Sequence, residues 1–361
     1  MKNSSIYIGV MSGTSLDGVD AVAFDTATQS IIHAHELPFS SDLRATCLRL
    51  QSTSENELHE AQCTSNILAG LYAQAINELC QHAHLNTQHI TAVGVHGQTI
   101  RHRPECGYTI QLNQPARIAE QTGMTVVADF RARDIAAGGQ GAPLVPAFHD
   151  YLWRDTAHNR VVLNIGGFAN ISVLNANQPT FGYDTGPGNV LMDAWINLHS
   201  GKNSDANGDW AASGAVHIEL LNALLSEPYF SQPHPKSTGR DGFHLDWLNA
   251  HLAALPNIAP ADVQATLLQL TAVTIANEIK TAQQIIVCGG GAYNSALLNA
   301  LQQLLPRAQI QTSDTYGINP QHVEAAAFAW LAAQTMQHLS GNLPAVTGAA
   351  GARILGHITL A

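Results

Sequence analysis

One acidic residue of the sequence lies where a carboxylate and an anion-binding backbone are expected to meet. Asp184 belongs to the segment GYDTGPGN, residues 182–189, and it precedes Gly186, Gly188 and Asn189, where we expect a helix to begin. Small residues let the positively polarised N–H groups at a helix N-terminus approach an anion. A carboxylate beside such a site is suited to general base catalysis. The alternative is an aspartate that caps the helix and has only a structural role.

A second polar segment follows the first apolar run of the chain. The sequence GVMSGTSLDGVD, residues 9–20, indicates a hairpin tip, in which Gly13 and Gly18 allow backbone N–H groups to approach a phosphate. Asp17 is a candidate to hold a metal-bound water. An ordinary polar hairpin would give the same pattern.

A third segment contains three consecutive glycines. The sequence IIVCGGGAYN, residues 285–294, indicates a buried strand that runs into a turn, followed by a helix over residues 295–305. Backbone of this kind can lie flat against a nucleotide. A dinucleotide-binding fold with Asp314 as its acidic residue is the alternative, but GGGxxN is a poor match to the GxGxxG spacing.

A fourth segment, EAAAFAW at residues 324–330, begins an alanine-rich helix. Its small residues would permit close packing on another helix, as at a hinge between lobes, and a small-residue core helix is the plainer interpretation. The sequence contains no GxxxxGK[ST], HExxH or GxSxG motif, so the common P-loop, zincin and hydrolase interpretations are excluded.

The composition is that of a compact globular protein with two domains. The chain has 361 residues, of which 45% are hydrophobic and 12% are charged. Sixteen Lys and Arg against 27 Asp and Glu give a net charge of -11, which argues against sequence-independent binding to nucleic acid or to an anionic membrane. A phosphate site would therefore depend on backbone N–H groups more than on basic side chains.

The N-terminus and the cysteines indicate a cytoplasmic protein without disulfides. The apolar run at residues 6–11 is too short for a signal-peptide core or a membrane span. The five cysteines lack CxxC spacing, so neither a disulfide framework nor a zinc site is expected, and we interpret them as buried apolar residues.

The elements that carry these motifs form a pattern that occurs twice. Apolar runs at residues 6–10 and 19–24 predict a β-hairpin, and runs at 161–165 and 168–174 predict another, about 155 residues later. Strands and helices alternate after each hairpin, so we expect two similar α/β halves with a cleft between them. The Gly- and Ala-rich segment at residues 131–146 is the predicted crossing between the halves.

Taken in chain order, these four motifs resemble those of the sugar kinase, heat-shock protein 70 and actin superfamily. More narrowly, the chain resembles the anhydro-N-acetylmuramic acid kinase family over nearly its full length. The resemblance is carried by six motifs, VMSGTSLDGVD, VHGQTIRHRP, DFRARDIAAGGQGAPLVP, NIGGFANIS, DTGPGN and GGGAYN. KSTGRDGFH, residues 236–244, also belongs to it, and there Lys236 and Arg240 would contact a carboxylate or phosphate or else lie in a solvated loop.

The resemblance implies an actin-like ATPase fold of two ribonuclease-H-like domains with the active site in the cleft. The first lobe would comprise residues 1–130 with about 340–361, and the second residues 131–339. The implied activity uses ATP, Mg²⁺ and water to open the 1,6-anhydro ring of anhydro-N-acetylmuramic acid and to phosphorylate O6, which yields N-acetylmuramic acid 6-phosphate and ADP in cell-wall recycling. A cytoplasmic homodimer without nucleic-acid or membrane partners is also implied.

The resemblance also assigns roles to single residues. Asp184 matches the general base that activates the attacking water, and Asp17 is the candidate metal contact. The predicted sugar contacts are His96, Gln98, Asp129, Arg131 and Glu324. The predicted nucleotide contacts are Gly13, Thr14, Ser15, Leu16, Asp17, Gly18, Val19, Asp20, Gly186, Gly188, Asn189, Gly289, Gly290, Gly291 and Asn294.

Two other functions use the same residues. A simple hexose or polyol kinase would use Asp184 to deprotonate a sugar hydroxyl, without opening a ring. A non-catalytic nucleotide-dependent module is the alternative from another class, because actin-like folds also serve as sensors and chaperones.

Overall fold

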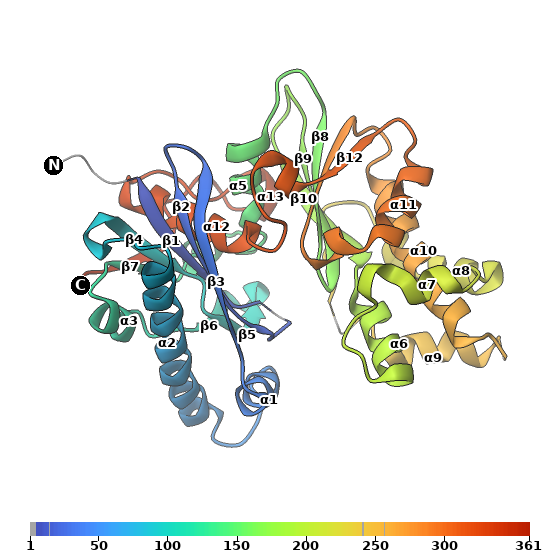
Figure 1. Cartoon of the computed structure of the whole chain (residues 1–361), viewed down its shortest axis with the longest axis horizontal. Helices are drawn as coiled ribbons and strands as arrows, with labels where there is room; N and C mark the ends of the chain where they lie inside the picture. The colour runs from blue at the N-terminus through green and yellow to red at the C-terminus, as the bar shows by residue number, and fades with distance from the viewer. Residues whose placement is uncertain (1–4, 14, 240–241, 256) are drawn as a thin grey trace. The chain divides into compact units, whose positions relative to one another are not determined.

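The chain folds into two compact units. The computed structural model describes residues 5–13, 15–239, 242–255 and 257–361 (Figure 1). The predicted contacts Thr14 and Arg240 lie outside the described residues. Unit 1 comprises Met1–Leu152 and His322–Ala361, and unit 2 comprises Trp153–Gln321.

These boundaries differ from the predicted ones at residues 130 and 340. The reason is that α5 (Val145–Trp153) and α12 (Val323–Met336) carry aromatic residues into the core of unit 1. The ring centroid of Phe148 lies 5.6 Å from that of Phe24 and 5.9 Å from that of Trp330. The segment 131–146 therefore lies within unit 1 and is not the crossing between the two units.

The sheet of unit 1 begins with the predicted hairpin. β1, β2 and β3 pair antiparallel in chain order, β4 pairs parallel with β1, and β7 pairs parallel with β4. The strand order is β13-β7-β4-β1-β2-β3. The bounds are β1 Ile6–Met11, β2 Gly18–Asp25, β3 Ser30–Pro38, β4 Ile90–Val95, β7 Val126–Ala128 and β13 His357–Thr359.

Helices cover both faces of this sheet. Ile8 and Val10 of β1 belong to the same core cluster as the buried face of α2, whereas Gly9 between them faces α12. A two-stranded sheet of β5 (Gln98–Arg103) and β6 (Tyr108–Leu112), which we did not predict, precedes helix α3. The remaining helices of unit 1 are α1 Ser41–Arg49, α2 Glu57–His82, α3 Pro115–Thr122, α4 Ala132–Ala136 and α13 Pro344–Thr347.

The small residues of α12 fit this helix to the sheet. A Cβ atom at Gly9 would lie 1.8 Å from the carbonyl oxygen of Ala325, and one at Gly94 would lie 2.1 Å from that of Phe328. Only glycine on the strands lets the helix backbone approach so closely. The EAAAFAW segment therefore packs on strands in the core of unit 1, as the plainer interpretation predicts, and the hinge between lobes stays a prediction.

Unit 2 repeats the strand order of unit 1. Its sheet has the order β10-β9-β8-β11-β12, in which the first three strands in the chain are antiparallel and the next two are parallel to the first. Both units thus share the order 3-2-1-4-5, which confirms the predicted ribonuclease-H-like fold for each. The bounds are β8 Arg160–Ile165, β9 Phe168–Leu174, β10 Phe181–Pro187, β11 Gln284–Cys288 and β12 Gln309–Thr312.

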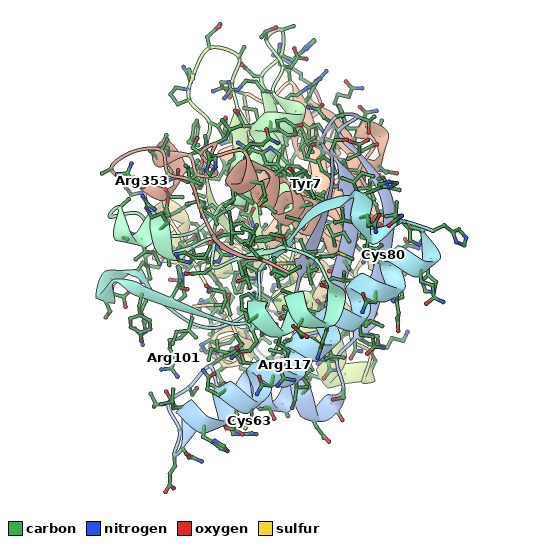
Figure 2. The ribbon with its side chains drawn as sticks, turned by 90° about the vertical axis from the view of Figure 1, so that its left-hand side faces the viewer. Tyr7, Cys63, Cys80, Arg101, Arg117 and Arg353 are labelled. Carbon is green, nitrogen blue, oxygen red and sulfur yellow. The ribbon has the colours of Figure 1, made fainter. Side chains whose placement is uncertain are left out.

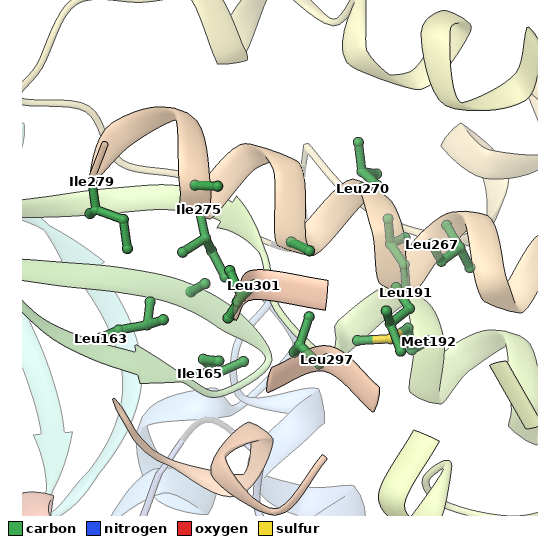
Figure 3. Packing of buried hydrophobic residues seen from close by; sticks show 14 of the residues in the cluster. Leu163, Ile165, Leu191, Met192, Leu267, Leu270, Ile275, Ile279, Leu297 and Leu301 are labelled. Atoms are coloured by element: carbon green, nitrogen blue, oxygen red, sulfur yellow. The ribbon is translucent and has the colours of Figure 1, made fainter. Parts of the chain in front are cut away.

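The core of unit 2 lies between this sheet and its helices. Figure 3 shows Leu163 and Ile165 of β8 facing Ile275 of α10 and Leu301 of α11. Burial of such side chains contributes roughly 1.5–3 kcal/mol each. The helices are α6 Val190–Ser200, α7 Asp209–Ser213, α8 Ile218–Leu225, α9 Leu245–Ala253, α10 Pro260–Glu278 and α11 Ser295–Leu304.

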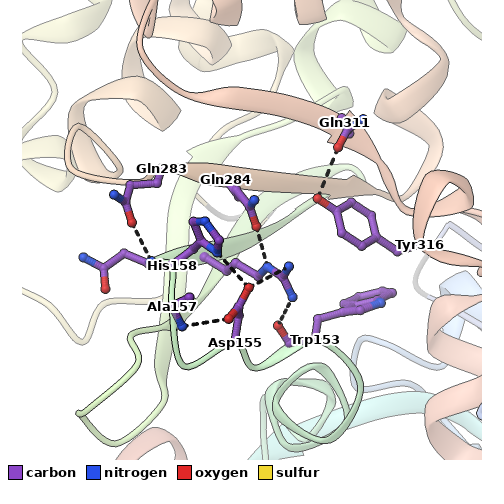
Figure 4. Close-up of polar contacts among 10 residues, drawn as sticks. Trp153, Asp155, Ala157, His158, Gln283, Gln284, Gln311 and Tyr316 are labelled. Atoms are coloured by element: carbon purple, nitrogen blue, oxygen red, sulfur yellow. Dashed lines mark hydrogen bonds and ion pairs between the residues drawn. The ribbon is translucent and has the colours of Figure 1, made fainter.

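Polar contacts hold the segment that leads into β8. Arg160 pairs with Asp155 at 3.0 Å and donates from Nη1 to the carbonyl of Trp153, also at 3.0 Å (Figure 4). Its Nε donates to Gln284 of β11 at 2.6 Å, so one guanidinium ties the entering segment to the sheet.

The cysteines differ in part from the prediction. All five are free, and Cys47, Cys80 and Cys288 are buried as predicted. Cys63, on the solvent side of α2 (Figure 2), and Cys106, in the turn between β5 and β6, are exposed, so that prediction is wrong for these two. None of the described helices has both the length and the apolar character that a membrane span requires.

Candidate active site

Asp184 lies on β10, at the edge of the sheet of unit 2. The pairing of β10 with β9 shifts register between Asp184 and Gly186, as at a β-bulge. Bulges at sheet edges redirect a side chain and often lie next to active sites. Gly186 has φ 147° and its Cβ would lie 2.8 Å from the ring of Phe230, so glycine is required there.

The carboxylate of Asp184 is held through one oxygen. Its Oδ2 accepts from the Ser237 hydroxyl at 3.0 Å and from the Thr238 backbone N–H at 3.1 Å. Burial raises the pKa of Asp184, and these two hydrogen bonds act in the opposite direction. Oδ1 accepts no hydrogen bond among the described residues of unit 2. One oxygen is thus fixed and the other is left to accept a proton.

Asp184 does not cap the helix that follows. The N-cap of α6 is Asn189, and the carboxylate of Asp184 bonds to the loop at Ser237 and Thr238 instead. The structural alternative of a helix cap is therefore wrong. Neither Ser237 nor Thr238 was singled out from the sequence, although both belong to the KSTG motif that we noted.

The first N–H groups at the N-terminus of α6 donate to a neighbouring turn of unit 2, and the anion site suggested by the sequence stays a prediction. The N–H groups of Gly188 and Asn189 donate, at 2.9 Å each, to the carbonyls of Gly167 and Gly166, and Val190 N–H donates to Gly167 at 3.0 Å. These first donors of the helix are occupied by the turn between β8 and β9. Gly188 is required because its Cβ would lie 2.4 Å from the Gly166 carbonyl oxygen.

The three glycines after β11 have different roles. Gly289 has φ 78°, and its Cβ would lie 2.4 Å from Asn164 Oδ1, while a Cβ at Gly291 would lie 2.3 Å from Ile165 Cγ2. Both let the turn approach the end of β8. A Cβ at Gly290 meets nothing closer than 4.0 Å, so the backbone is open at this position.

Asn294 begins the next helix. Its Oδ1 accepts from the Leu297 N–H at 3.0 Å and so caps α11, and its side chain is buried. The predicted nucleotide contact therefore uses its side-chain oxygen for a structural hydrogen bond.

The hairpin tip of unit 1 combines exposed polar side chains with buried apolar ones. Ser15 and Asp17 are exposed, whereas the side chains of Leu16 and Val19 are buried in the core. Leu16 has φ 59°, a left-handed conformation that turns its side chain inward. Gly13 and Gly18 flank this tip, and the Gly18 Cβ would lie 2.3 Å from the Leu37 carbonyl oxygen.

Asp20 lies directly after this tip, on β2. Its partner in the β3 register is Glu36. Burial raises the pKa of Asp20 from 3.8 to about 7, with further contributions from the charges of Glu36, Glu324 and Asp17. The carboxylates around the hairpin thus repel one another. Among the described residues no three His, Cys, Asp or Glu side chains are placed to hold a metal ion.

Two predicted sugar contacts of unit 1 bond to each other. His96 Nε2 accepts from Arg131 Nε at 3.2 Å and from Nη2 at 2.9 Å, and Arg131 Nη1 donates to the Gly141 carbonyl at 2.8 Å. Burial, with the charge of Arg131, holds the pKa of His96 well below its ordinary value. Burial lowers the pKa of Arg131 to about 10. A neutral histidine therefore lies against a charged guanidinium near pH 7.

The other predicted contacts of unit 1 lie on separate elements. Gln98 is fully buried and its Nε2 donates to the Gly13 carbonyl at 3.2 Å, which links β5 to the hairpin tip. Asp129 has φ 60° and its Oδ2 lies 3.0 Å from His357 Nδ1. Glu324, at the start of α12, contributes to the electrostatics of both Asp20 and Arg131.

Lys236 is a buried structural cation. Its side chain is 2% exposed, and Nζ lies 2.8 Å from Glu278 Oε1. The solvated loop position considered from the sequence is therefore wrong for this side chain, and the contact with a substrate carboxylate or phosphate stays a prediction. The sequence did not reveal Glu278, because the end of a long helix carries no motif.

Comparisons with known proteins point to one family. A sequence profile described as anhydro-N-acetylmuramic acid kinase matches residues 5–361. A protein of that name from Nitrosomonas europaea is 52% identical over 360 residues, which cover 98% of this chain and 99% of that protein. Another from Pseudomonas fluorescens is 49% identical over 359 residues, with coverage of 98% and 99%.

Proposed function

The chain belongs to the anhydro-N-acetylmuramic acid kinase family, and on that premise we propose that it opens the 1,6-anhydro ring of anhydro-N-acetylmuramic acid with water and phosphorylates O6 from ATP. The water oxygen forms a bond to C1 and the bond between C1 and O6 breaks. O6 takes the γ-phosphoryl group, and the bond to the β-phosphate breaks. The products are N-acetylmuramic acid 6-phosphate and ADP.

Asp184 is the general base in this proposal. The supporting observation is its asymmetric carboxylate, in which Ser237 and Thr238 hold Oδ2 and no described residue of unit 2 bonds Oδ1. Oδ1 takes the proton of the water that attacks C1, and this proton later returns to solvent. Burial favours the neutral form, while the two hydrogen bonds favour the carboxylate that a base must present.

The binding residues follow from the same proposal. The hairpin tip at residues 13–20 contacts the ATP phosphates, chiefly through backbone N–H groups and Ser15, because Leu16 and Val19 are buried. The open backbone at Gly290 is suited to lie against the adenosine. The sugar contacts are His96, Gln98, Asp129, Arg131 and Glu324.

Mg²⁺ would accompany the nucleotide and offset the charge of its phosphates. Mg²⁺ is usually held by one or two carboxylates together with substrate phosphates and waters, so a site without three protein ligands is compatible with it. The exposed carboxylate of Asp17 is the residue that we assign to this contact, through water.

The reaction in ¹⁸O-labelled water tests the chemistry. Ring opening places one labelled oxygen at C1 of the phosphorylated sugar at early times, before anomer exchange with solvent, and transfer to a sugar hydroxyl incorporates none. A phosphorylated product that still contains the anhydro ring would establish the simple hexose or polyol kinase instead.

Asp184→Asn tests the base. The variant keeps the size of the side chain and should lower kcat by about 100-fold or more, since general base catalysis typically contributes 10²–10⁴-fold. ATP binding, measured by calorimetry, should be nearly unchanged. Full turnover by this variant would refute the assigned role.

We further propose that the enzyme works in the cytoplasm as a homodimer, with ATP and the anhydro-sugar as its partners and without nucleic-acid or membrane partners.

A further inference from the structure

A buried ion pair in unit 2 connects three segments around Asp184. Glu278, the last residue of α10, accepts from Lys236 Nζ at 2.8 Å through Oε1 and from the Tyr183 hydroxyl at 2.9 Å through Oε2. Tyr183 directly precedes Asp184 on β10, and Lys236 directly precedes Ser237. One carboxylate therefore bonds both to the strand that carries Asp184 and to the loop that holds its side chain.

Backbone contacts complete the connection. The Asp184 N–H donates to the Lys236 carbonyl at 3.1 Å, and the Tyr229 hydroxyl donates to the Asp184 carbonyl at 2.7 Å. Lys236 Nζ also lies 3.3 Å from the Phe230 carbonyl oxygen and 5.2 Å from the Tyr229 ring centroid. The described titratable groups of unit 2 that these contacts link to Asp184 are Tyr183, Tyr229, Lys236 and Glu278, and the ring of His234 stacks on that of Tyr183 at a centroid distance of 5.0 Å.

The energetics of this pair favour a role in geometry. Removing two charges from water costs about as much as their attraction returns, so a buried pair adds little net stability compared with apolar residues. Its directional hydrogen bonds nevertheless fix the groups that they join. Here these groups are the two segments whose spacing determines whether Ser237 and Thr238 can donate to Asp184 Oδ2.

We propose that Glu278, paired with Lys236, is a positioning residue for the general base. It holds the loop at residues 236–238 against β10, so that Oδ2 of Asp184 is hydrogen-bonded and Oδ1 is presented for proton transfer. This inference rests on the proposed role of Asp184 as the base. The ion pair does not touch the Asp184 side chain and acts on its ionisation only through the hydrogen bonds of Ser237 and Thr238.

The test measures the ionisation of Asp184 directly. Protein labelled with ¹³C at the aspartate carboxyl carbons is titrated by NMR without substrate, and the Asp184 signal is assigned by its loss in Asp184→Asn. Lys236→Met combined with Glu278→Gln should raise the Asp184 pKa by about one pH unit, because the hydrogen bonds that favour the carboxylate weaken while no net charge is changed. The acid limb of kcat/KM should move to higher pH by the same amount.

The double variant is used because Glu278→Gln alone would leave the Lys236 ammonium unpaired, and that charge would lower the Asp184 pKa. Lys236→Met combined with Glu278→Gln removes both charges, so that no lone ammonium remains buried. Asp155→Asn is the matched control, because it breaks the ion pair with Arg160 in the same unit. It should leave both the Asp184 pKa and the acid limb unchanged.

The outcomes separate this inference from the proposed function. An unchanged Asp184 pKa in the folded double variant would overturn the positioning role, while an inactive Asp184→Asn would still support the base. Full activity of Asp184→Asn would overturn the base itself. A loss of activity at every pH without movement of the acid limb or of the NMR titration would show that Glu278 and Lys236 act only on stability.

Discussion

The ionisation of Asp20 should make the stability of unit 1 depend on pH. Burial, assisted by Glu36, Glu324 and Asp17, raises the pKa of Asp20 from 3.8 to about 7. A folded-state pKa above the unfolded value means that the contribution of the group to stability is complete below pH 3.8. This contribution is lost progressively as the pH rises to about 7, because the unfolded chain releases the proton first.

The magnitude follows from the two pKa values. A difference of about 3 pH units at about 1.36 kcal/mol each corresponds to about 4 kcal/mol above pH 7, and to about 2 kcal/mol at pH 5. Asp20→Asn removes the ionisation and keeps the size of the side chain. The variant should therefore be more stable than the parent by about 4 kcal/mol at pH 8, with a smaller gain at pH 5.

Urea unfolding at pH 5 and pH 8 measures this difference. Trp330 is the single tryptophan of unit 1, so its ¹⁹F signal in protein labelled with 5-fluorotryptophan reports the unfolding of that unit. Added ligands should be absent, because they stabilise the folded state by mass action. Carboxyl ¹³C NMR of the parent protein should place the midpoint of Asp20 near pH 7.

Asp25 provides a control at the other end of β2. A hydrogen bond with the Ser5 side chain, together with the Ala27 N–H at 2.9 Å, lowers its pKa. The stability from Asp25 is therefore present above pH 3.8 and is lost as the pH falls. Asp25→Asn should lower stability similarly at pH 5 and pH 8. A gain from Asp20→Asn that is equal at both pH values, or a loss at pH 8, would refute the reasoning for Asp20.

Two further predictions concern the packing of unit 1. Gly9→Ala should lower its free energy of unfolding by more than about 2 kcal/mol, because the new Cβ would lie 1.8 Å from the Ala325 carbonyl oxygen. Gly70→Ala, within α2 and with no atom within 4 Å of its Cβ, should raise it by about 0.5–1 kcal/mol in the same urea assay; equal effects would contradict the steric argument. Asp134→Asn should cost about 2–4 kcal/mol, since the buried carboxylate accepts from Gly141 N–H, Asn342 and Thr347 at 2.6–2.8 Å. A change below 1 kcal/mol in the urea midpoint analysis would show that the three donors find other acceptors.

Local patterns predicted the elements correctly because they encode local physics. The apolar runs that became β1, β2, β8 and β9 alternate with turn residues, and this is sufficient to identify hairpins. The β5–β6 sheet was missed because β5 contains Arg and His, and because both strands are partly exposed and lack an apolar run. The position of Asp184 beside a glycine-rich strand end was also visible in the sequence.

The structural roles of the glycines could not be derived from the sequence. Gly188 and Gly291 are explained by backbone and side chains from β8 and its turn, which are distant in the chain. The same holds for Gly9, whose partner Ala325 lies more than three hundred residues away. Glycine in a motif indicates close approach, but it does not say whether a ligand or another strand approaches.

By itself the sequence determined two α/β halves, the segment that carries the candidate base, and the family to which the chain belongs. Only the tertiary structure decided which groups act on Asp184. Ser237 and Thr238 reach its carboxylate from more than fifty residues away, and Glu278 joins their loop to β10 from a helix end without a motif. The physical reason is that burial and hydrogen bonds set the ionisation and orientation of a carboxylate, and both depend on neighbours that folding brings together.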